Sequence, residues 1–267
     1  MFKSLVVILS LAVIFTSGSL RADSIDAESQ PAENCRFNYA WTEFPPFMIP
    51  SPQKPTGAQI ELLEWVAEEM GCGVAFKNMN WKNSISAIKD GSVDVIGRAS
   101  VTPERNKFAR FSSSYRDEVL VLTIRKGESQ SLQYVNLEEL FERGFRLGVL
   151  RGGYFGKELE AIRANLKYQS NFHERAKEAD LLLALKNKEI DGFFEEPFII
   201  DNAVMTKSLY SEFEEYPIEM LVGKVHFMFS KQTISEEKVE RFNQALNRVK
   251  NSEKYKSHWY WSTVYKK

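Results

Sequence analysis

The chain is 267 residues long, with 43% hydrophobic and 13% aromatic residues, so it can bury a sizeable core as one large domain or as two lobes. Its 35 basic and 36 acidic side chains nearly cancel, and no stretch gathers basic residues as a phosphate-binding face would. Composition therefore argues against a nucleic-acid-binding protein and predicts an ordinary folded one.

The N-terminal segment differs in character from the rest of the chain. Lys3 precedes an eleven-residue apolar run, LVVILSLAVIF, and small residues follow in TSGSLRADS. This order is typical of a secretory signal peptide, with cleavage near Ala22 or, alternatively, Ser19. The apolar run is short for a membrane span, and no cysteine stands at the cut for a lipid anchor. We therefore expect residues 1–22 to be removed on export.

Behind this segment, strand-like and helix-like stretches alternate. The predicted elements are a strand at 36–40, a helix at 58–71, a strand at 74–78, a helix at 83–91 and a strand at 93–97. The first helix has one apolar face, which runs from Ile60 to Met70, and Gly71 ends it. Such alternation is typical of an α/β protein with parallel strands.

Cys35 and Cys72 are the two cysteines, and each precedes one of the predicted strands. If those strands are neighbours in a parallel sheet, both sulfur atoms lie at the same edge of it, and export permits a disulfide. A bridge over a loop of this length would stabilise the fold by about 3–4 kcal/mol. The alternative is a pair of free thiols.

Two segments, Ile85 to Gly97 and Leu182 to Phe194, share a pattern. Both contain Ala, an apolar residue, Lys, three polar or small residues, an apolar residue and Asp. The echo predicts two lobes of similar build with a cleft between them. Because ligands of open α/β sheets lie beyond the carboxyl ends of the strands, residues just after each segment should face that cleft. They are Arg98, Ser100 and Arg105 after the first segment, and Glu195 and Glu196 after the second.

A series of motifs then runs through the chain in a fixed order. They are FPPF at 44–47, GAQIELLEWVAEEMG at 57–71, DGSVDVI at 90–96, TPER and FSSSY between 102 and 115, LRGGYFG at 150–156, EIDGFFEEP at 189–197, VHFMFSK at 225–231 and EKYKSHWYW at 253–261. The set resembles the bacterial extracellular solute-binding proteins of family 3, which are periplasmic receptors for polar amino acids that feed ABC importers. The resemblance covers almost the whole chain behind the signal peptide.

The resemblance implies an α/β fold of the type II periplasmic-binding-protein class, with two lobes that close over a ligand. Each lobe would be a mostly parallel sheet flanked by helices. The first would comprise residues 23–115 plus 226–267 and the second residues 116–225, with hinge crossovers near 115–119 and 221–225. We expect a periplasmic monomer that hands its ligand to an ABC permease in the inner membrane.

The same resemblance assigns a site for the ligand carboxylate. Arg105 would hold it with a bidentate, charge-assisted pair, and Ser100 would add a hydroxyl donor. In LRGGYFGKELEAI, a strand is expected to run through glycines into a helix, so that free N–H groups at Gly153 and Tyr154 and the helix dipole favour an anion. The alternative for Arg105 is an exposed surface arginine.

The other end of the ligand needs a carboxylate and walls. Glu196 stands where amino-acid receptors of the family usually carry Asp, so it would receive the ligand ammonium group. Alternatively, Glu195 and Glu196 form a solvated strand end. Phe44 and Trp81 would supply aromatic walls, which suit apolar or cationic ligands.

Three residues depart from the family pattern. Trp41 stands near a position that is often polar or acidic, Gly153 replaces the usual Thr, and Arg98 replaces a common small residue. Bulk from Trp41 and Arg98 would shrink the pocket or change its preference, and an inward Arg98 would favour an acidic ligand. On the surface, Arg98 would present only its carbonyl to the cleft. We expect an amino acid or a related small carboxylated solute without naming one.

Signals for catalysis are weak. His173, His226 and His258 are scattered without a metal-binding spacing, and no nucleophile motif occurs, so neither a metal nor a cofactor is expected. One alternative function is a dehydratase-like enzyme with Glu196 as general acid. Another is a solitary periplasmic sensor or accessory binding module, which the sequence does not separate from an importer's receptor.

Overall fold

The computed structural model describes residues 35–133, 136–205 and 212–259. All of them belong to one compact unit, Pro31–Lys267. The predicted signal peptide at residues 1–22 lies outside the described residues. Within these residues, no helix has the length and apolar character that crossing a membrane requires.

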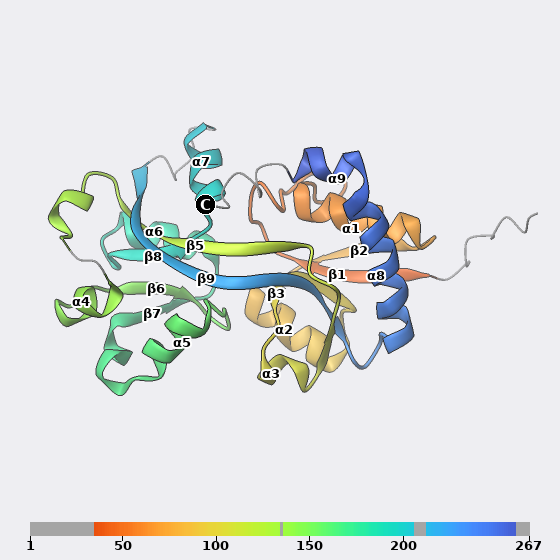
Figure 1. Ribbon diagram of the computed structural model, residues 1–267, viewed down its shortest axis with the longest axis horizontal. Coiled ribbons are helices and arrows are strands. Elements are labelled where there is room, and N and C mark those ends of the chain that lie inside the picture. The colour runs from red at the N-terminus through yellow and green to blue at the C-terminus, as the bar shows by residue number, and fades with distance from the viewer. Residues whose placement is uncertain (1–34, 134–135, 206–211, 260–267) are drawn as a thin grey trace, which may run out of the picture. The chain divides into compact units, whose positions relative to one another are not determined.

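A mixed sheet of nine strands runs through the described part of the chain (Figure 1). Its order is β2-β1-β3-β9-β5-β8-β6-β7, and β4 pairs with β9 beside this path. The strands are β1 (Arg36–Trp41), β2 (Gly73–Asn78), β3 (Val95–Ser100), β4 (Ala109–Phe111), β5 (Arg116–Arg125), β6 (Leu147–Leu150), β7 (Phe172–Arg175), β8 (Gly192–Glu195) and β9 (Phe213–Ser230).

The long strands β5 and β9 join the two halves of this sheet. They are antiparallel and pair from Arg116 opposite Val225 to Arg125 opposite Phe213. Beyond that stretch β9 continues and pairs with β3, while the other edge of β5 pairs with β8. Figure 1 shows the two strands side by side between the strands of one half and those of the other. The two expected sheets are therefore joined into one.

The two halves have the same strand order. We call β1 to β4 with the C-terminal part of β9 the first half, and β5 to β8 the second half. The order β2-β1-β3-β9 of the first half matches β7-β6-β8-β5 of the second, and in both the first three strands are parallel while the fourth is antiparallel. This arrangement confirms the predicted α/β class with two similar, mostly parallel parts.

An aspartate fixes the start of the third strand in each half. The Asp94 N–H donates to the Asn38 carbonyl at 2.9 Å, and the Asp94 carboxylate accepts the Asn38 N–H at 2.8 Å. The Asp191 N–H likewise donates to the Arg146 carbonyl at 2.8 Å, and its carboxylate accepts the Arg146 N–H at 2.9 Å. The sequence echo thus corresponds to one structural unit used twice.

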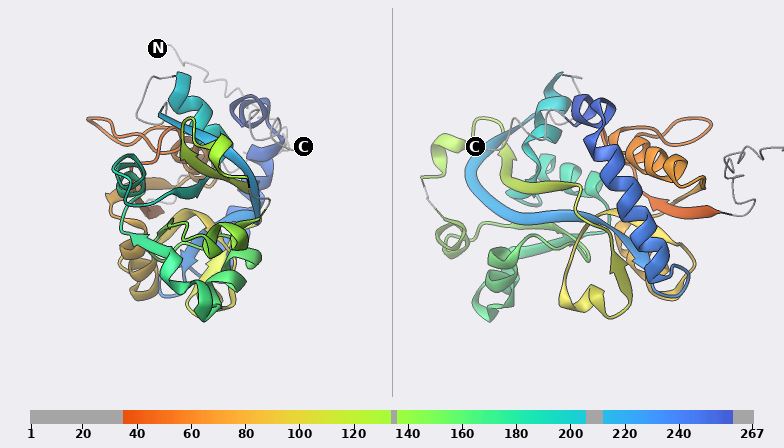
Figure 2. Two further views of the ribbon diagram at one scale, coloured as in Figure 1. Left: turned by 90° about the vertical axis from the view of Figure 1, so that its left-hand side faces the viewer. Right: turned by 45° about the vertical axis from the view of Figure 1, so that its right-hand side comes forward.

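Helices pack against the sheet through the apolar faces that the sequence predicts. The predicted face of α1 is buried from Ile60 to Ala67, and Gly71 follows with a left-handed φ of 67° that ends the helix. Helix α8 lies beside α1 (Figure 2). The helices are α1 (Ala58–Glu69), α2 (Trp81–Asp90), α3 (Pro103–Asn106), α4 (Leu137–Glu142), α5 (Lys157–Ala164), α6 (Glu178–Lys186), α7 (Pro197–Met205), α8 (Glu236–Asn251) and α9 (Glu253–His258), with short 3₁₀ helices at Ser129–Ser131 and Leu166–Asn171.

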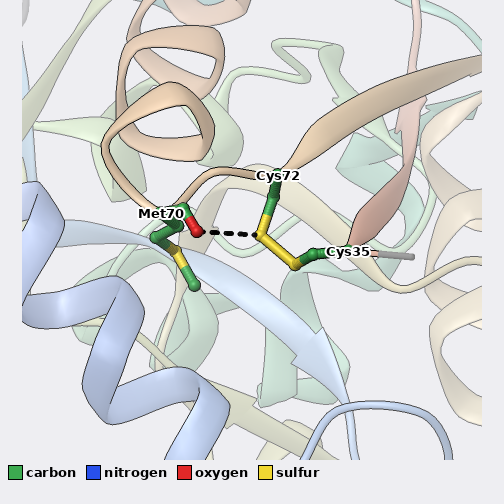
Figure 3. Close-up of a disulfide and its surroundings, with 3 residues drawn as sticks. All are labelled: Cys35, Met70 and Cys72. Carbon is green, nitrogen blue, oxygen red and sulfur yellow. Dashed lines mark hydrogen bonds between the residues drawn. A yellow bond between two sulfur atoms is a disulfide. The ribbon is translucent and has the colours of Figure 1, made fainter. Parts of the chain in front are cut away.

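The predicted disulfide between Cys35 and Cys72 is present (Figure 3). Strands β1 and β2 are parallel neighbours with Arg36 opposite Gly73, so the residues before them meet at one edge, with their Cα atoms 4.6 Å apart. The Cys72 sulfur also lies 3.7 Å from the Met70 carbonyl oxygen. The bridge thereby ties the end of α1 to the start of the sheet.

Replacing both cysteines, as Cys35→Ser with Cys72→Ser, should destabilise the protein without changing its fold. The bridge closes a loop with a sequence separation of 37. Its loss should lower the free energy of unfolding by about 3–4 kcal/mol and the melting temperature by roughly 10 °C. Urea unfolding of the wild type, with and without reductant, and of the double variant measures this. Equal midpoints for oxidised wild type and variant would contradict the prediction.

Candidate ligand-binding cleft

A cavity of about 80 Å³, room for several water molecules, lies between the first half, β5 and the rest of the second half. Its lining residues are Phe44, Trp81, Arg98, Ser100 and Arg105 from the first half, Glu118 and Leu120 from β5, and Leu150, Gly153, Tyr154, Phe155, Glu178, Leu181, Phe194 and Glu195 from the rest. Seven of the nine residues predicted for the site therefore gather around one space. Glu196 and Trp41 do not line it.

A short helix places Arg105 at this cavity. Thr102 precedes α3, and its side chain accepts the Arg105 N–H at 3.2 Å. Pro103 suits the first position of the helix because the N–H that it lacks would have no helical partner there. The TPER motif is therefore a capped helical turn that turns its arginine inward.

The Arg105 side chain is buried without an opposite charge in contact. The residue is 7% exposed, and its guanidinium donates to the carbonyls of Ser100 at 2.9 Å and Gly152 at 3.2 Å. Among the described residues, no carboxylate lies within ion-pair distance of it. Burial lowers the pKa of Arg105, and the more distant charges of Glu118 and Glu160 oppose that shift. Arg105 is thus not an exposed surface arginine.

Glu196 is engaged by the protein itself. Its two carboxylate oxygens accept from the Arg116 guanidinium at 2.7 and 2.9 Å, and both side chains are buried. Burial lowers the pKa of Arg116, but the carboxylates of Glu196 and Glu118 outweigh burial and raise it. Glu196 therefore stands behind the cavity wall. The alternative of a solvated strand end is wrong, because Glu195 and Glu196 are only 6% and 4% exposed.

Three other carboxyl groups line the cavity: Glu118 on β5, Glu178 at the start of α6 and Glu195 at the end of β8. Burial raises the pKa of Glu195 to about 8, and it also raises the pKa of Glu178. Burial, together with the charge of Glu196, raises the pKa of Glu118 to about 7. Near neutral pH these carboxyl groups are therefore partly protonated, and the wall carries less negative charge than three carboxylates would.

Arg98 points into the cavity, which decides between the two positions that the sequence left open. Its guanidinium carbon lies 3.5 Å from the centroid of the Phe44 ring, and its Nη2 atom lies 3.7 Å from a Glu196 oxygen. The residue has a left-handed φ of 55°. The structure thus brings a second arginine to the same space as Arg105.

Trp81 and Arg105 both donate a hydrogen bond to the carbonyl oxygen of Gly152, which belongs to the second half. Asn80 caps α2 by accepting the Asn83 N–H, and Trp81 follows as the first residue of the helix. The Trp81 indole N–H donates to the Gly152 carbonyl at 3.0 Å, and the same oxygen accepts from Arg105. Two donors of the first half therefore meet one acceptor of the second.

The predicted anion cradle in the LRGGYFG loop is wrong in one respect. The Gly153 N–H is not free, because it donates to the Leu150 carbonyl at 2.9 Å. Helix α5 begins only at Lys157, and Glu160 in its first turn accepts the Phe155 N–H at 3.4 Å. A Cβ atom on Gly153 would lie 2.9 Å from the Phe155 ring, which accounts for glycine in place of the usual Thr.

Trp41 lines a second, larger cavity beside the first. Its volume is about 710 Å³, and it shares Phe44 and Glu178 with the small cavity. Prolines and aliphatic side chains contribute to its walls, among them Pro45, Pro46, Ile49, Pro50, Leu182 and Ile199. Trp41 therefore does not narrow the small cavity.

The sequence motifs did not predict Arg116, Glu118 and Glu178 as residues at or beside the site. Arg116, Glu118 and Leu120 alternate along β5 and are all buried. Charged residues at alternate positions that lead into an apolar strand are a detectable signal of a buried polar site. For Glu178, a carboxylate in the first turn of a helix is too common to single it out.

The histidines lie apart from one another. His173 belongs to β7, His226 contacts the Ser112 carbonyl through Nδ1 at 2.7 Å, and His258 packs on Trp65. Within residues 35–133, 136–205 and 212–259, no group of three or more His, Cys, Asp or Glu side chains could hold a metal ion.

Comparison with known proteins gives a consistent family. The sequence model of the bacterial extracellular solute-binding proteins, family 3, matches residues 40–260. A probable histidine-binding protein of Campylobacter jejuni is 32% identical over 152 residues, which cover 56% of this chain and 55% of that protein. The chain thus matches about half the length of this relative. The ABC transporter arginine-binding protein 1 of Escherichia coli is 26% identical over 183 residues, 66% of this chain and 68% of that protein.

Solved structures share the fold. An ancestral arginine-binding protein bound to arginine superposes with a TM-score of 0.70 at 22% identity, over 85% of this chain and 97% of the other. Its likeness, at that identity, shows the type II two-lobed fold and nothing about the ligand of this chain.

Glu195→Gln should weaken the pH dependence of stability. The pKa of Glu195 rises from 4.5 to about 8 on folding. The folded protein therefore holds this proton more tightly, and the stabilisation is present below the unfolded pKa and lost as pH rises through the folded pKa. The wild-type melting temperature should fall between about pH 5 and pH 8, and the variant should lose part of that fall. Exposed Glu219→Gln is the control. Identical pH profiles for all three proteins would contradict the prediction.

Proposed function

Because the chain belongs to the bacterial extracellular solute-binding proteins of family 3, we propose that it captures an amino acid or a related small carboxylated solute and delivers it to an ABC importer. The Escherichia coli relative is named as the arginine-binding protein of an ABC transporter, which supports an importer's permease as the partner. The family supplies the class of function. The residues around the cavity supply the class of ligand.

The buried, uncompensated charge of Arg105 is the observation that carries this proposal. A buried cation costs free energy unless an opposite charge pairs with it. Arg105 contacts two carbonyl oxygens and the Trp81 ring, whose centroid lies 5.5 Å from its guanidinium carbon, and it pairs with no carboxylate among the described residues. Its guanidinium borders the cavity, where a ligand carboxylate could accept a planar, charge-assisted pair. Ser100 also lines the cavity and offers a hydroxyl donor. Arg116 needs no such partner because Glu196 neutralises it.

The ammonium group of the ligand would lie against Glu195. This residue lines the cavity, and its carboxyl accepts the Glu196 N–H at 2.9 Å. Glu178 lines the same space. An arriving ammonium group would favour the charged form of Glu195 over the protonated form that burial favours. Glu195 therefore takes the role that the family pattern suggested for Glu196.

Binding would close two lobes, residues 23–115 plus 226–267 and residues 116–225, about hinges near 115–119 and 221–225. Two features of the linking strands support these hinges. The pairing of β5 with β9 shifts register between Glu118 and Val119. Gly223, opposite Glu118, has a φ of 108°, and a Cβ atom at this position would have no packing neighbour within 4 Å. The contacts of the Gly152 carbonyl with Trp81 and Arg105 would be kept in the closed arrangement and broken in the open one.

We further propose that the protein works as a monomer in the periplasm after residues 1–22 are removed. A receptor fits the cavity better than a dehydratase-like enzyme, because the acid of that alternative, Glu196, has both oxygens on Arg116. A solitary sensor would need the same trap. Stimulation of an importer's ATPase by the liganded protein separates the sensor from the importer's receptor.

Arg105→Ala should abolish amino-acid binding and leave the fold intact. Thermal unfolding of the wild type with each standard amino acid should give a shift of a few degrees at about 100 times the dissociation constant. In the variant the affinity should fall by at least about 100-fold, because the carboxylate loses its charged partner.

Arg248→Ala is the matched control, since Arg248 forms an exposed pair with Glu69 at 2.9 Å and does not line the cavity. It should bind as the wild type does. Wild-type affinity in a folded Arg105→Ala protein would show that the carboxylate binds elsewhere.

Trp81→Phe should remove the fluorescence signal of closure. The wild-type emission should change when the ligand shifts the protein from an open arrangement to the closed one, in which the Trp81 indole donates to the Gly152 carbonyl. The variant should lose most of this change and bind roughly fivefold more weakly, as expected for one hydrogen bond. Trp65→Phe, which alters an indole packed against His258, should keep the change. A full signal in Trp81→Phe would mean that Trp81 does not report closure.

A further inference from the structure

Arg98 fills the aromatic and acidic corner of the small cavity with the chain's own guanidinium. The group lies 3.5 Å from the Phe44 centroid and 5.7 Å from that of Phe47, whose ring is nearly parallel at 8°. Its Nη2 atom is 3.7 Å from Glu196, and its charge lowers the raised pKa values of the carboxyl groups that line the cavity. A cation on an aromatic face beside carboxylates is a stable arrangement.

The backbone around Arg98 is built to hold this position. Pairing between β3 and β9 is irregular between Ile96 and Ala99, and Arg98 adopts its φ of 55° inside that irregularity. The Arg98 N–H donates to the Tyr115 hydroxyl at 2.8 Å, and that hydroxyl donates to buried Gln59 at 2.5 Å. A left-handed arginine is costly and persists only when its surroundings fix it. The inward direction of Arg98 is therefore set by the fold.

A ligand with a cationic side chain would compete with Arg98 for the same contacts. It would need the face of Phe44 that the guanidinium of Arg98 covers and a carboxylate beside that face, where Glu196 lies 3.7 Å from Arg98. Glu196 is held by Arg116, and like charges would face each other near Arg98. An inward Arg98 alone would favour an acidic ligand. A second carboxylate on the ligand would, however, lie beside Glu118, Glu178 and Glu195, and burial raises the pKa values of these groups because the space disfavours negative charge. A neutral side chain meets neither obstacle.

We propose that Arg98 determines specificity by occupying the cation site of the cleft, so that the protein rejects amino acids with cationic side chains and takes neutral ones. This inference rests on the proposed function for the identity of the ligand. Whether Arg98 occupies a cation site can be tested without any amino acid. It separates this chain from the relatives named for arginine or histidine.

Arg98→Gly tests directly whether Arg98 occupies the cation site. Glycine adopts the φ of 55° without strain, and removal of the side chain exposes Phe44 and Glu196. Lys188→Gly is the matched control, because Lys188 is the other described residue besides glycine with a positive φ, 60°, and it is exposed away from the cavity. Ethylguanidinium at millimolar concentration should raise the melting temperature of Arg98→Gly by a few degrees and should leave the wild type and Lys188→Gly unchanged.

The amino-acid arm uses calorimetry with arginine, lysine and a panel of neutral and acidic amino acids. The wild type should bind a neutral amino acid and no basic one, and Arg98→Gly should gain at least about tenfold in arginine affinity. Wild-type binding of arginine, tighter binding of an acidic amino acid than of neutral ones, or no gain in a folded Arg98→Gly would overturn this inference. If Arg98→Gly does not fold, Arg98→Ala takes its place in both arms.

Binding of no amino acid by any of these proteins would instead contradict an amino acid as the ligand of the proposed function and leave another small carboxylated solute. In that event the ethylguanidinium response still decides whether Arg98 fills a cation site. If ethylguanidinium does not stabilise Arg98→Gly, the proposal that Arg98 occupies a cation site is overturned. The two failures are therefore distinguishable.

Discussion

The buried ion pair between Arg116 and Glu196 sets the arrangement of the other charges around the cavity. Arg116 stands where β5 begins, and Glu196 follows the end of β8, so the pair joins β5 to the rest of the second half. Removing one partner of such a pair leaves an uncompensated buried charge, at a cost of about 3–5 kcal/mol. With Glu196 engaged, Glu195 is the one of the two adjacent glutamates that lines the cavity, and Arg98 lies 3.7 Å from a Glu196 oxygen. Arg105 is then left as the buried arginine whose contacts are neutral.

Much of the fold followed from the sequence because local patterns determine it. The apolar face of α1, the repeated pattern that contains Asp94 and Asp191, and the disulfide all depend on periodicity and on parallel neighbours. Which of two adjacent glutamates faces the cavity depends on where β8 ends, and a strand end shifts by a residue without any change in the pattern. The direction of Arg98 depends on one left-handed residue inside an irregular pairing, which sequence periodicity does not encode.

The same reasoning explains why a shared fold and a shared family leave the ligand open. The scaffold of this chain superposes on that of an arginine-bound protein. Ligand preference, however, is a difference between a few contact free energies, and one buried side chain can reverse it. In this chain Arg105, which we propose for the ligand carboxylate, and Arg98 line one cavity, so the charge that a ligand brings must fit two cations and three carboxyl groups.

The contact between the halves at Gly152 is made by a main-chain oxygen. Both of its donors, the Trp81 indole and the Arg105 guanidinium, belong to side chains that evolution can replace, whereas the acceptor is present whatever residue occupies position 152. The residues that set ligand preference and the contact at the Gly152 carbonyl can therefore change independently in evolution. A lineage could exchange Arg98 and the glutamates to recognise another solute and still retain the acceptor at which the halves meet.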